Sequence, residues 1–167
     1  MAEKDTRFSS KIKYAGIFSF KDFYIFCNDW LTNETNLLMS EEKYAEKISE
    51  DTKKIDIEWT GQRKFTDYFR FDVQVEFKIT ELTEVEIQEG NAKIKTNKGS
   101  VEVKIKGILV RDYDGKFEKT AGKKFLRSIY EKWVIPSRIE EFEEKIITGC
   151  DEFLNQAKAY LDIEGKK

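Results

Sequence analysis

Residues 55–79, IDIEWTGQRKFTDYFRFDVQVEFKI, decide the fold class. Apolar side chains occupy most of the odd positions on both sides of a short central turn, and polar side chains occupy the even positions. This period of two is typical of two β-strands that each bury one face. A three-residue turn, Thr66-Asp67-Tyr68, keeps both apolar sets on the same face. The stretch therefore predicts an antiparallel hairpin.

Further stretches predict more strands around this hairpin. Residues 8–18 and 101–109 alternate clearly between apolar and polar side chains. Residues 37–49 have good helix propensity, yet a strand fits the surrounding order better, and we predict a strand there. Turn signals at 89–91 and 97–99 predict a small hairpin over 85–95, inserted before the strand at 101–109.

Helical periodicity flanks the strands. Ser19 is a candidate N-cap for an apolar stripe over 20–31, and a second stripe over 125–134 stops before Pro136. Ser137 and Glu140 form a capping box before a long stripe that ends near Leu161. The order predicts one α+β domain over residues 1–167. Its antiparallel meandering sheet would pack against a long C-terminal helix, with one N-terminal and one further short helix.

Composition limits the setting and the partners. The 167 residues include 30 basic and 32 acidic side chains, a net charge of −2 that gives no global field toward nucleic acid or anionic lipid. No apolar run approaches the roughly 20 residues that span a bilayer. Residues 1–10 are polar and lack the apolar region of a secretory signal. We therefore expect a cytoplasmic protein without a membrane span.

The chain has no histidine, which excludes Ser-His-Asp and Cys-His catalytic sites and every zinc site that needs histidine. Two cysteines, Cys27 and Cys150, cannot build a structural zinc site, and we expect no cofactor. Both fall on apolar helix faces, which predicts buried free thiols. A disulfide between them would require the two helices to pack together. An enzyme is the third functional hypothesis, limited to carboxylate or metal-assisted chemistry.

Three charged motifs favour structural interpretations. Residues 112–115, DYDG, resemble part of a calcium loop, but Val110 stands where another ligand is needed, so a tight turn is favoured. Residues 120–124, TAGKK, could hold an anion at a helix start, although solvated lysines are the commoner case. A basic cluster lacks interleaved aromatic residues in a chain of pI about 5.5, which disfavours nucleic acid. Its members are Lys93, Lys95, Lys98, Lys104, Lys106 and Arg111.

Arg63 is the most informative single residue. It stands on the otherwise apolar face of its strand, two positions after Gly61 and four after Trp59. A buried arginine is unfavourable unless it is paired. Either the strand end has reached solvent, or a cavity opens there and Arg63 faces a carboxylate or phosphate. Gly61 and Gly107 leave gaps that suit a cavity, strand coiling or a bulge.

Four stretches resemble a family of small uncharacterised archaeal proteins. They are GIFSFKDFYIFCNDWL (16–31), IEWTGQRKFTDYFRFDVQVEFKI (57–79), GSVEVKIKGILVRDYDGKFE (99–118) and FLRSIYEKWVI (125–135). The resemblance implies an archaeal cytoplasmic setting and carries no function. The element order is also similar to that of helix-grip (START-like) domains, a likeness of fold alone.

The leading hypothesis is a non-enzymatic binding module with a cavity for a small molecule or a lipid-like ligand between the sheet and the C-terminal helix. Trp59 would supply an apolar wall and Arg63 a polar anchor, with Tyr14 and Tyr44 from neighbouring strands in the lining. The ligand would be apolar or anionic. The alternative is a protein–protein or self-assembly module that uses the helix at 125–134 or an edge of the sheet.

Overall fold

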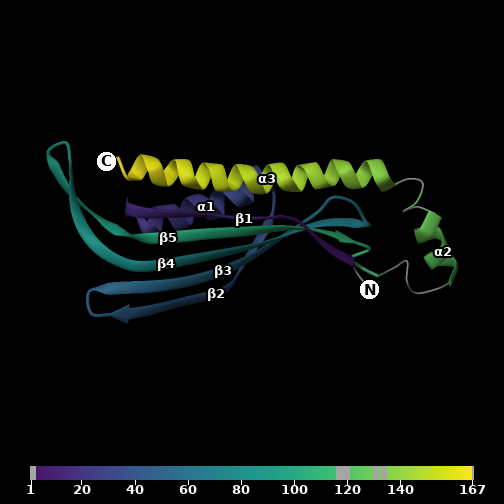
Figure 1. The fold of residues 1–167 in the computed structure, drawn as a ribbon, viewed down its shortest axis with the longest axis horizontal. Coiled ribbons are helices and arrows are strands. Elements are labelled where there is room, and N and C mark those ends of the chain that lie inside the picture. The colour runs from purple at the N-terminus through teal and green to yellow at the C-terminus, as the bar shows by residue number, and fades with distance from the viewer. Residues whose placement is uncertain (1–2, 116–120, 130–131, 133–134, 167) are drawn as a thin grey trace.

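The computed structural model describes residues 3–115, 121–129, 132 and 135–166. Five strands form one open antiparallel sheet in the order β1-β5-β4-β3-β2 (Figure 1). The strands are β1 Glu3–Phe18, β2 Leu38–Ser49, β3 Thr52–Lys64, β4 Phe69–Glu89 and β5 Ala92–Arg111. The helices are α1 Phe20–Glu34, α2 Ala121–Ile129 and α3 Ile135–Glu164. The predicted α+β class, with an antiparallel sheet and a long C-terminal helix, is confirmed.

Helices α1 and α3 cover one face of the sheet. α3 lies along β1 and β5 for most of the length of the sheet (Figure 1). The Phe23 ring of α1 lies 6.1 Å from the ring of Phe77 in β4 and 6.0 Å from that of Tyr160 in α3. The hydrophobic core therefore lies between the sheet and the two helices. In the described part of the chain, no helix is both long and apolar enough to cross a membrane.

The β3–β4 hairpin has the register that the alternation predicts. Ile57 pairs with Phe77 and Arg63 pairs with Phe71, so the odd positions of both strands share the face toward the helices. At the turn, the backbone N–H groups of Phe65 and Thr66 both donate to the carbonyl of Phe69. Residues 38–49 form an edge strand beside β3, which confirms the strand predicted there.

The β4–β5 hairpin differs from the prediction. The two strands stay paired from Phe69 and Arg111 to their turn, so residues 85–95 are the tip of one long hairpin and not a separate insertion. The predicted turn at 97–99 is wrong, because these residues lie inside β5. Instead, the register shifts between Thr80 and Thr83 in β4. A Cβ on Gly99 would lie 3.0 Å from the Leu82 Cα, so this glycine allows close strand approach beside the bulge.

The helix boundaries confirm some predicted caps and correct others. Ser19 is the N-cap of α1, and its side chain accepts a hydrogen bond from the N–H of Asp22. The predicted capping box at Ser137 is wrong, because α3 already begins at Ile135. Pro136 then stands in the first turn, where its missing N–H needs no partner. Of the helix predicted over 125–134, α2 covers only the first part, and residues 130, 131, 133 and 134 lie outside the described residues.

The predicted apolar stripe of α3 faces the sheet. Its buried members are Phe142, Ile146, Cys150, Phe153, Leu154, Ala157 and Leu161. Cys27 and Cys150 are both buried and free, as predicted. The gaps at Gly61 and Gly107 are filled: a Cβ on Gly61 would lie 2.5 Å from the Met39 sulfur, and Gly107 lies against α3. Neither glycine therefore opens a cavity inside the core.

Candidate functional site

An open cleft lies between α3 and one end of the sheet. Its walls come from the last turn of α1, the adjoining ends of β3 and β4, and the N-terminal half of α3. It encloses about 510 Å³. The lining residues are Glu34, Thr35, Arg63, Phe65, Phe71, Glu141, Glu144, Lys145, Thr148 and Gly149. We call this hollow the Arg63 cleft.

Arg63 enters the cleft because β3 continues its inward-facing series to the end of the strand. Its side chain is half-buried, and its Nη1 donates a hydrogen bond of 3.3 Å to the carbonyl of Thr35 at the C-terminus of α1. The guanidinium carbon lies 5.5 Å from the centre of the Phe65 ring. A guanidinium has five N–H donors, and this contact uses one of them. Arg63 is thus held in place while donor capacity is left for a bound anion.

Aromatic rings form the inner wall of the cleft. Phe65 stacks on Phe142 of α3, with ring centres 4.6 Å apart and an angle of 11° between the planes. Phe65 also stacks on Phe71 of β4 at 6.0 Å. Phe71 and Phe142 are buried, whereas Phe65 is only half-buried. The stack therefore gives the cleft a rigid apolar surface beside the guanidinium.

The rim of the cleft is charged and mostly acidic. Lys145 lies 5.7 Å from the centre of the Phe142 ring and forms an ion pair of 3.5 Å with Glu141. Glu34, Glu141 and Glu144 are all exposed. Arg63 and Lys145 thus face three carboxylates around one opening. This balance tolerates a single negative charge at Arg63 and repels ligands that carry several.

The groups around the cleft are suited to binding. Its three carboxylates, those of Glu34, Glu141 and Glu144, are exposed to water. Within the described ranges, no group of three or more Cys, Asp or Glu side chains is arranged to hold a metal ion. The arrangement offers a cation, an aromatic wall and an opening to solvent.

Trp59 does not line the Arg63 cleft. The residue is 3% exposed, and its ring packs between two others, 5.1 Å from the ring of Tyr24 and 4.7 Å from that of Phe77. Its Nε1 donates to a carboxylate oxygen of Glu41 at 3.2 Å, and the Tyr24 hydroxyl donates to the same oxygen at 2.6 Å. Burial, followed by this hydrogen bond, raises the pKa of Tyr24 to about 12. The space expected beside Trp59 is therefore occupied by α1.

Tyr44 and Tyr14 lie in two other places. Tyr44 stands on the edge strand β2, exposed, with its ring 6.5 Å from that of Tyr24. Tyr14 lines a separate open hollow on β1, and its hydroxyl donates to the carbonyl of Ile17. In the strand register, Tyr14 pairs with Val101 of β5, whereas Arg63 lies in the same row across the sheet as Leu109 of β5. Val101 and Leu109 are about 27 Å apart along β5, so Tyr14 and Arg63 lie far from each other. Of the four predicted site residues, Trp59 and Tyr44 both contact the ring of Tyr24. Arg63 and Tyr14 line two other, separate hollows.

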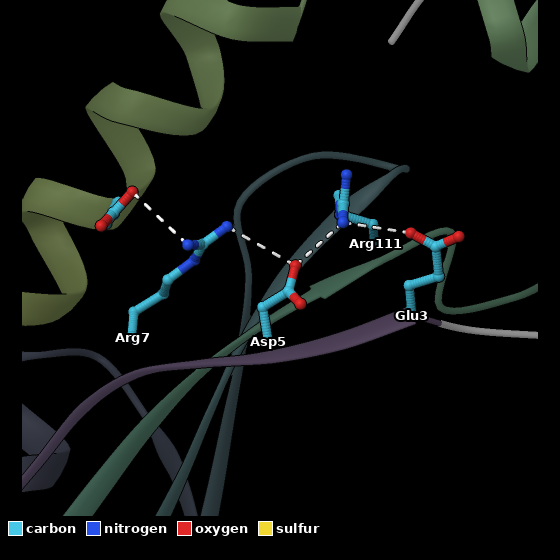
Figure 2. Close-up of polar contacts among 5 residues, drawn as sticks. Glu3, Asp5, Arg7 and Arg111 are labelled. Carbon is cyan, nitrogen blue, oxygen red and sulfur yellow. Dashed lines mark hydrogen bonds and ion pairs between the residues drawn. The ribbon is translucent and has the colours of Figure 1, made fainter.

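A second polar cluster joins β1, β5 and α3 (Figure 2). Asp5 lies between two arginines: one of its oxygens is 2.9 Å from Nη2 of Arg111 and 3.5 Å from Nη2 of Arg7. Arg111 also contacts Glu3 at 3.1 Å, and Arg7 reaches Glu143 of α3 at 3.9 Å. Arg7 lies where the register of β1 against β5 shifts, between Thr6 and Phe8. A β-bulge at such a shift changes the direction of the side chain of the bulged residue. We call this set the Asp5 network. It ties the first strand to the last strand and to α3.

The sequence did not single out the Asp5 network. Of its members, only Arg111 belongs to a motif that the sequence marks, the basic cluster along residues 93–111. The structure pairs Arg111 with Glu3 and Asp5 and places Lys95 3.9 Å from Glu84. Lys104 stands opposite Glu76 in β4. Carboxylates are thus interleaved with these cations, an arrangement that does not favour a polyanion.

The chain was compared with protein-family models, with curated proteins and with solved structures, and none of the three comparisons found a match. The functional proposal therefore depends on the chemistry of the Arg63 cleft itself.

Proposed function

We propose that this chain is a non-enzymatic binding module that holds a small anionic molecule with an apolar body in the Arg63 cleft. The observation that carries the proposal is the position of the Arg63 guanidinium beside the exposed edge of an aromatic stack. Arginine suits carboxylate and phosphate because its planar fork can donate two parallel hydrogen bonds. The stack offers the apolar body of the same ligand a complementary surface.

The size and charge of the cleft restrict the ligand class. A volume of about 510 Å³ falls within the range typical of small-molecule sites. The three rim glutamates disfavour di- and triphosphates, because each added negative charge would approach Glu34, Glu141 or Glu144. An aryl or branched alkyl monocarboxylate matches the Arg63 guanidinium and the apolar wall best.

The first test is native mass spectrometry of freshly purified protein without a tag. A monomer with an additional, releasable mass would support the proposal and would identify the ligand class. The matching binding test uses calorimetry with a panel of aryl and alkyl monocarboxylates. We expect Arg63→Ala to weaken binding by about 10- to 100-fold, the loss of a charge-assisted hydrogen-bonded pair.

Two further variants make the test specific. Arg63→Lys keeps the charge and loses the fork, so it should recover only part of the affinity. Arg138→Ala removes an exposed arginine of α3 that does not line the cleft, and it should bind like the parent protein. If Arg63→Ala retained the parent affinity, or if neither the purified protein nor the panel showed binding, the proposal would be wrong.

A second candidate function is association through the edge strand β2. Leu38 is 81% exposed and Ile48 is 66% exposed on this strand, and Tyr44 is exposed between them. Exposed edges of this kind pair with strands of other chains, although Glu41, Glu42 and Lys43 oppose such pairing here. Sedimentation velocity over a wide concentration range tests this candidate. A dimer that the Ile48→Lys substitution dissociates would support association through β2, and a monomer at every concentration would exclude it.

A further inference from the structure

α2 presents apolar side chains to solvent at one end of the molecule. Phe125 is 66% exposed, Leu126 is 58% exposed and Ile129 is 41% exposed. Figure 1 shows α2 standing apart from the sheet, beyond the N-terminal end of α3. A Cβ added to Gly122 would meet no atom within 4 Å. This helix therefore contributes little to the core, and its apolar residues need another explanation.

The apolar side chains of α2 share one face. At 100° per residue, Phe125, Ile129 and Leu126 fall within an arc of about 100°. Lys124 falls roughly opposite the middle of that arc, and Lys123 falls beside its border. A short helix with aromatic and aliphatic residues on one face and lysines on the other is typical of segments that lie in a membrane interface.

Charge is distributed very unevenly along the chain. Residues 116–132 contain six basic and two acidic residues, whereas the other 150 residues contain 24 basic and 30 acidic residues. The net charge of −2 is therefore the sum of +4 on residues 116–132, the positive segment, and −6 on the rest of the chain. An anionic surface would attract the segment around α2 and repel the rest of the protein, which fixes the orientation of approach.

We propose that α2 docks the protein on anionic lipid surfaces, with Phe125, Leu126 and Ile129 inserted at the boundary between headgroups and acyl chains. The exposure of these three residues supplies the apolar contact, and the positive segment supplies the attraction. A symmetric contact with a second copy is disfavoured, because it would bring two positive segments together. Nucleic acid would offer no surface for the apolar face.

The proposal is tested by cosedimentation with two kinds of vesicle, pure phosphatidylcholine and phosphatidylcholine mixed with phosphatidylserine. We expect binding to the mixed vesicles alone. Binding should weaken as the salt concentration rises from about 0.1 M to about 1 M, because the Debye length falls from about 10 Å to about 3 Å. The F125S/L126S variant should bind at least about 100-fold more weakly, and K123Q/K124Q roughly 10- to 30-fold more weakly.

Matched variants control for the loss of any exposed apolar or basic residue. I25S/I163S removes two exposed apolar residues from α1 and α3, and K47Q/K54Q removes two exposed lysines from β2 and β3. Both should bind mixed vesicles like the parent protein. The α2 variants should keep the parent circular dichroism spectrum and unfolding midpoint, because they remove exposed side chains only.

Three results would overturn the proposal. The first is equal sedimentation with both kinds of vesicle or with neither. The second is equal weakening in the control variants. The third is a dimer in sedimentation velocity that F125S/L126S dissociates while vesicle binding is absent, which would assign the apolar face of α2 to a second copy. These outcomes do not involve ligand binding at Arg63, so they are separate from the test of the cleft.

Discussion

The backbone of Gly107 lies so close to the thiol of Cys150 that a Cβ at position 107 would be 2.8 Å from the sulfur. The same Cβ would be 2.6 Å from a methyl carbon of Ile146, one turn earlier in α3. β5 and α3 reach this separation because position 107 has no side chain. The close approach of α3 to β5 at this point thus depends on one glycine.

The Gly107→Ala variant should lower the free energy of unfolding by about 1–3 kcal/mol, the usual effect of an extra methyl group in a packed core. Urea denaturation measures the change. Gly122→Ala in α2 is the matched control, because a Cβ there meets no atom within 4 Å and alanine favours helix. Equal stability of Gly107→Ala and the parent protein would contradict the close contact.

Removing the side chain of Arg63 should cost only about 1 kcal/mol of stability. Its one hydrogen bond to the Thr35 carbonyl is near solvent, and water can replace it. Thermal unfolding of Arg63→Ala beside Arg138→Ala measures the difference. A loss above about 3 kcal/mol would mean that Arg63 mainly holds α1 against the sheet, and the Arg63 cleft would lose its proposed anchor.

Stability should fall at alkaline pH. Burial is the leading cause that raises the pKa of Tyr24, Tyr160 and Cys150 to about 12 each, from ordinary values of 10.0 for tyrosine and 9.0 for cysteine. The unfolded chain therefore loses these protons first, so stability is complete below about pH 9 and declines as the pH rises toward 12. Urea midpoints over this range measure the decline. Tyr24→Phe should make it shallower, and a flat profile up to about pH 11 would refute the assignment.

The Asp5 network should depend on Asp5 more than on Glu3. Asp5→Ala leaves Arg7 and Arg111 without the carboxylate between them and should lower the free energy of unfolding by about 1–3 kcal/mol. Glu3 is more exposed than Asp5, and of the two arginines in Figure 2 it contacts Arg111 and not Arg7. Glu3→Ala should therefore lower the free energy of unfolding by less than about 1 kcal/mol. Differential scanning calorimetry compares the two variants. The reverse order would show that the bridge through Asp5 is not the stabilising contact.

Local periodicity was enough to predict the fold class but not the site. Alternation placed Arg63 on the inward face of β3, because strand geometry alone decides which face a residue occupies. It could not show that Tyr24, on a helix, fills the space beside Trp59, because the position of α1 over the sheet is a tertiary property. Tyr14 and Arg63 share that face, yet their separation along β5 depends on register between distant strands.

The same limit explains the missed Asp5 network. Asp5 and Arg111 meet only because β1 pairs with β5, and no local pattern in the sequence encodes that partner. The bulge at Arg7 interrupts the alternation of apolar and polar residues in β1 at one position only. A single interruption of this kind also arises by chance, so it does not identify a bulge in the sequence. The resemblances to an archaeal family and to helix-grip domains stay predictions.

The order of the sheet also has a consequence for biosynthesis. β1 is the first of the five described strands, yet its partner is β5, the last of these five to be made. A nascent chain leaving the ribosome therefore carries β1 without its neighbour until Ala92 and the residues beyond it have emerged. Pairing across so long a separation in sequence is slow to form, because the intervening loop must be closed first. During that interval the apolar side of β1, including Phe8 and Phe18, lacks its partner strand and is open to aggregation.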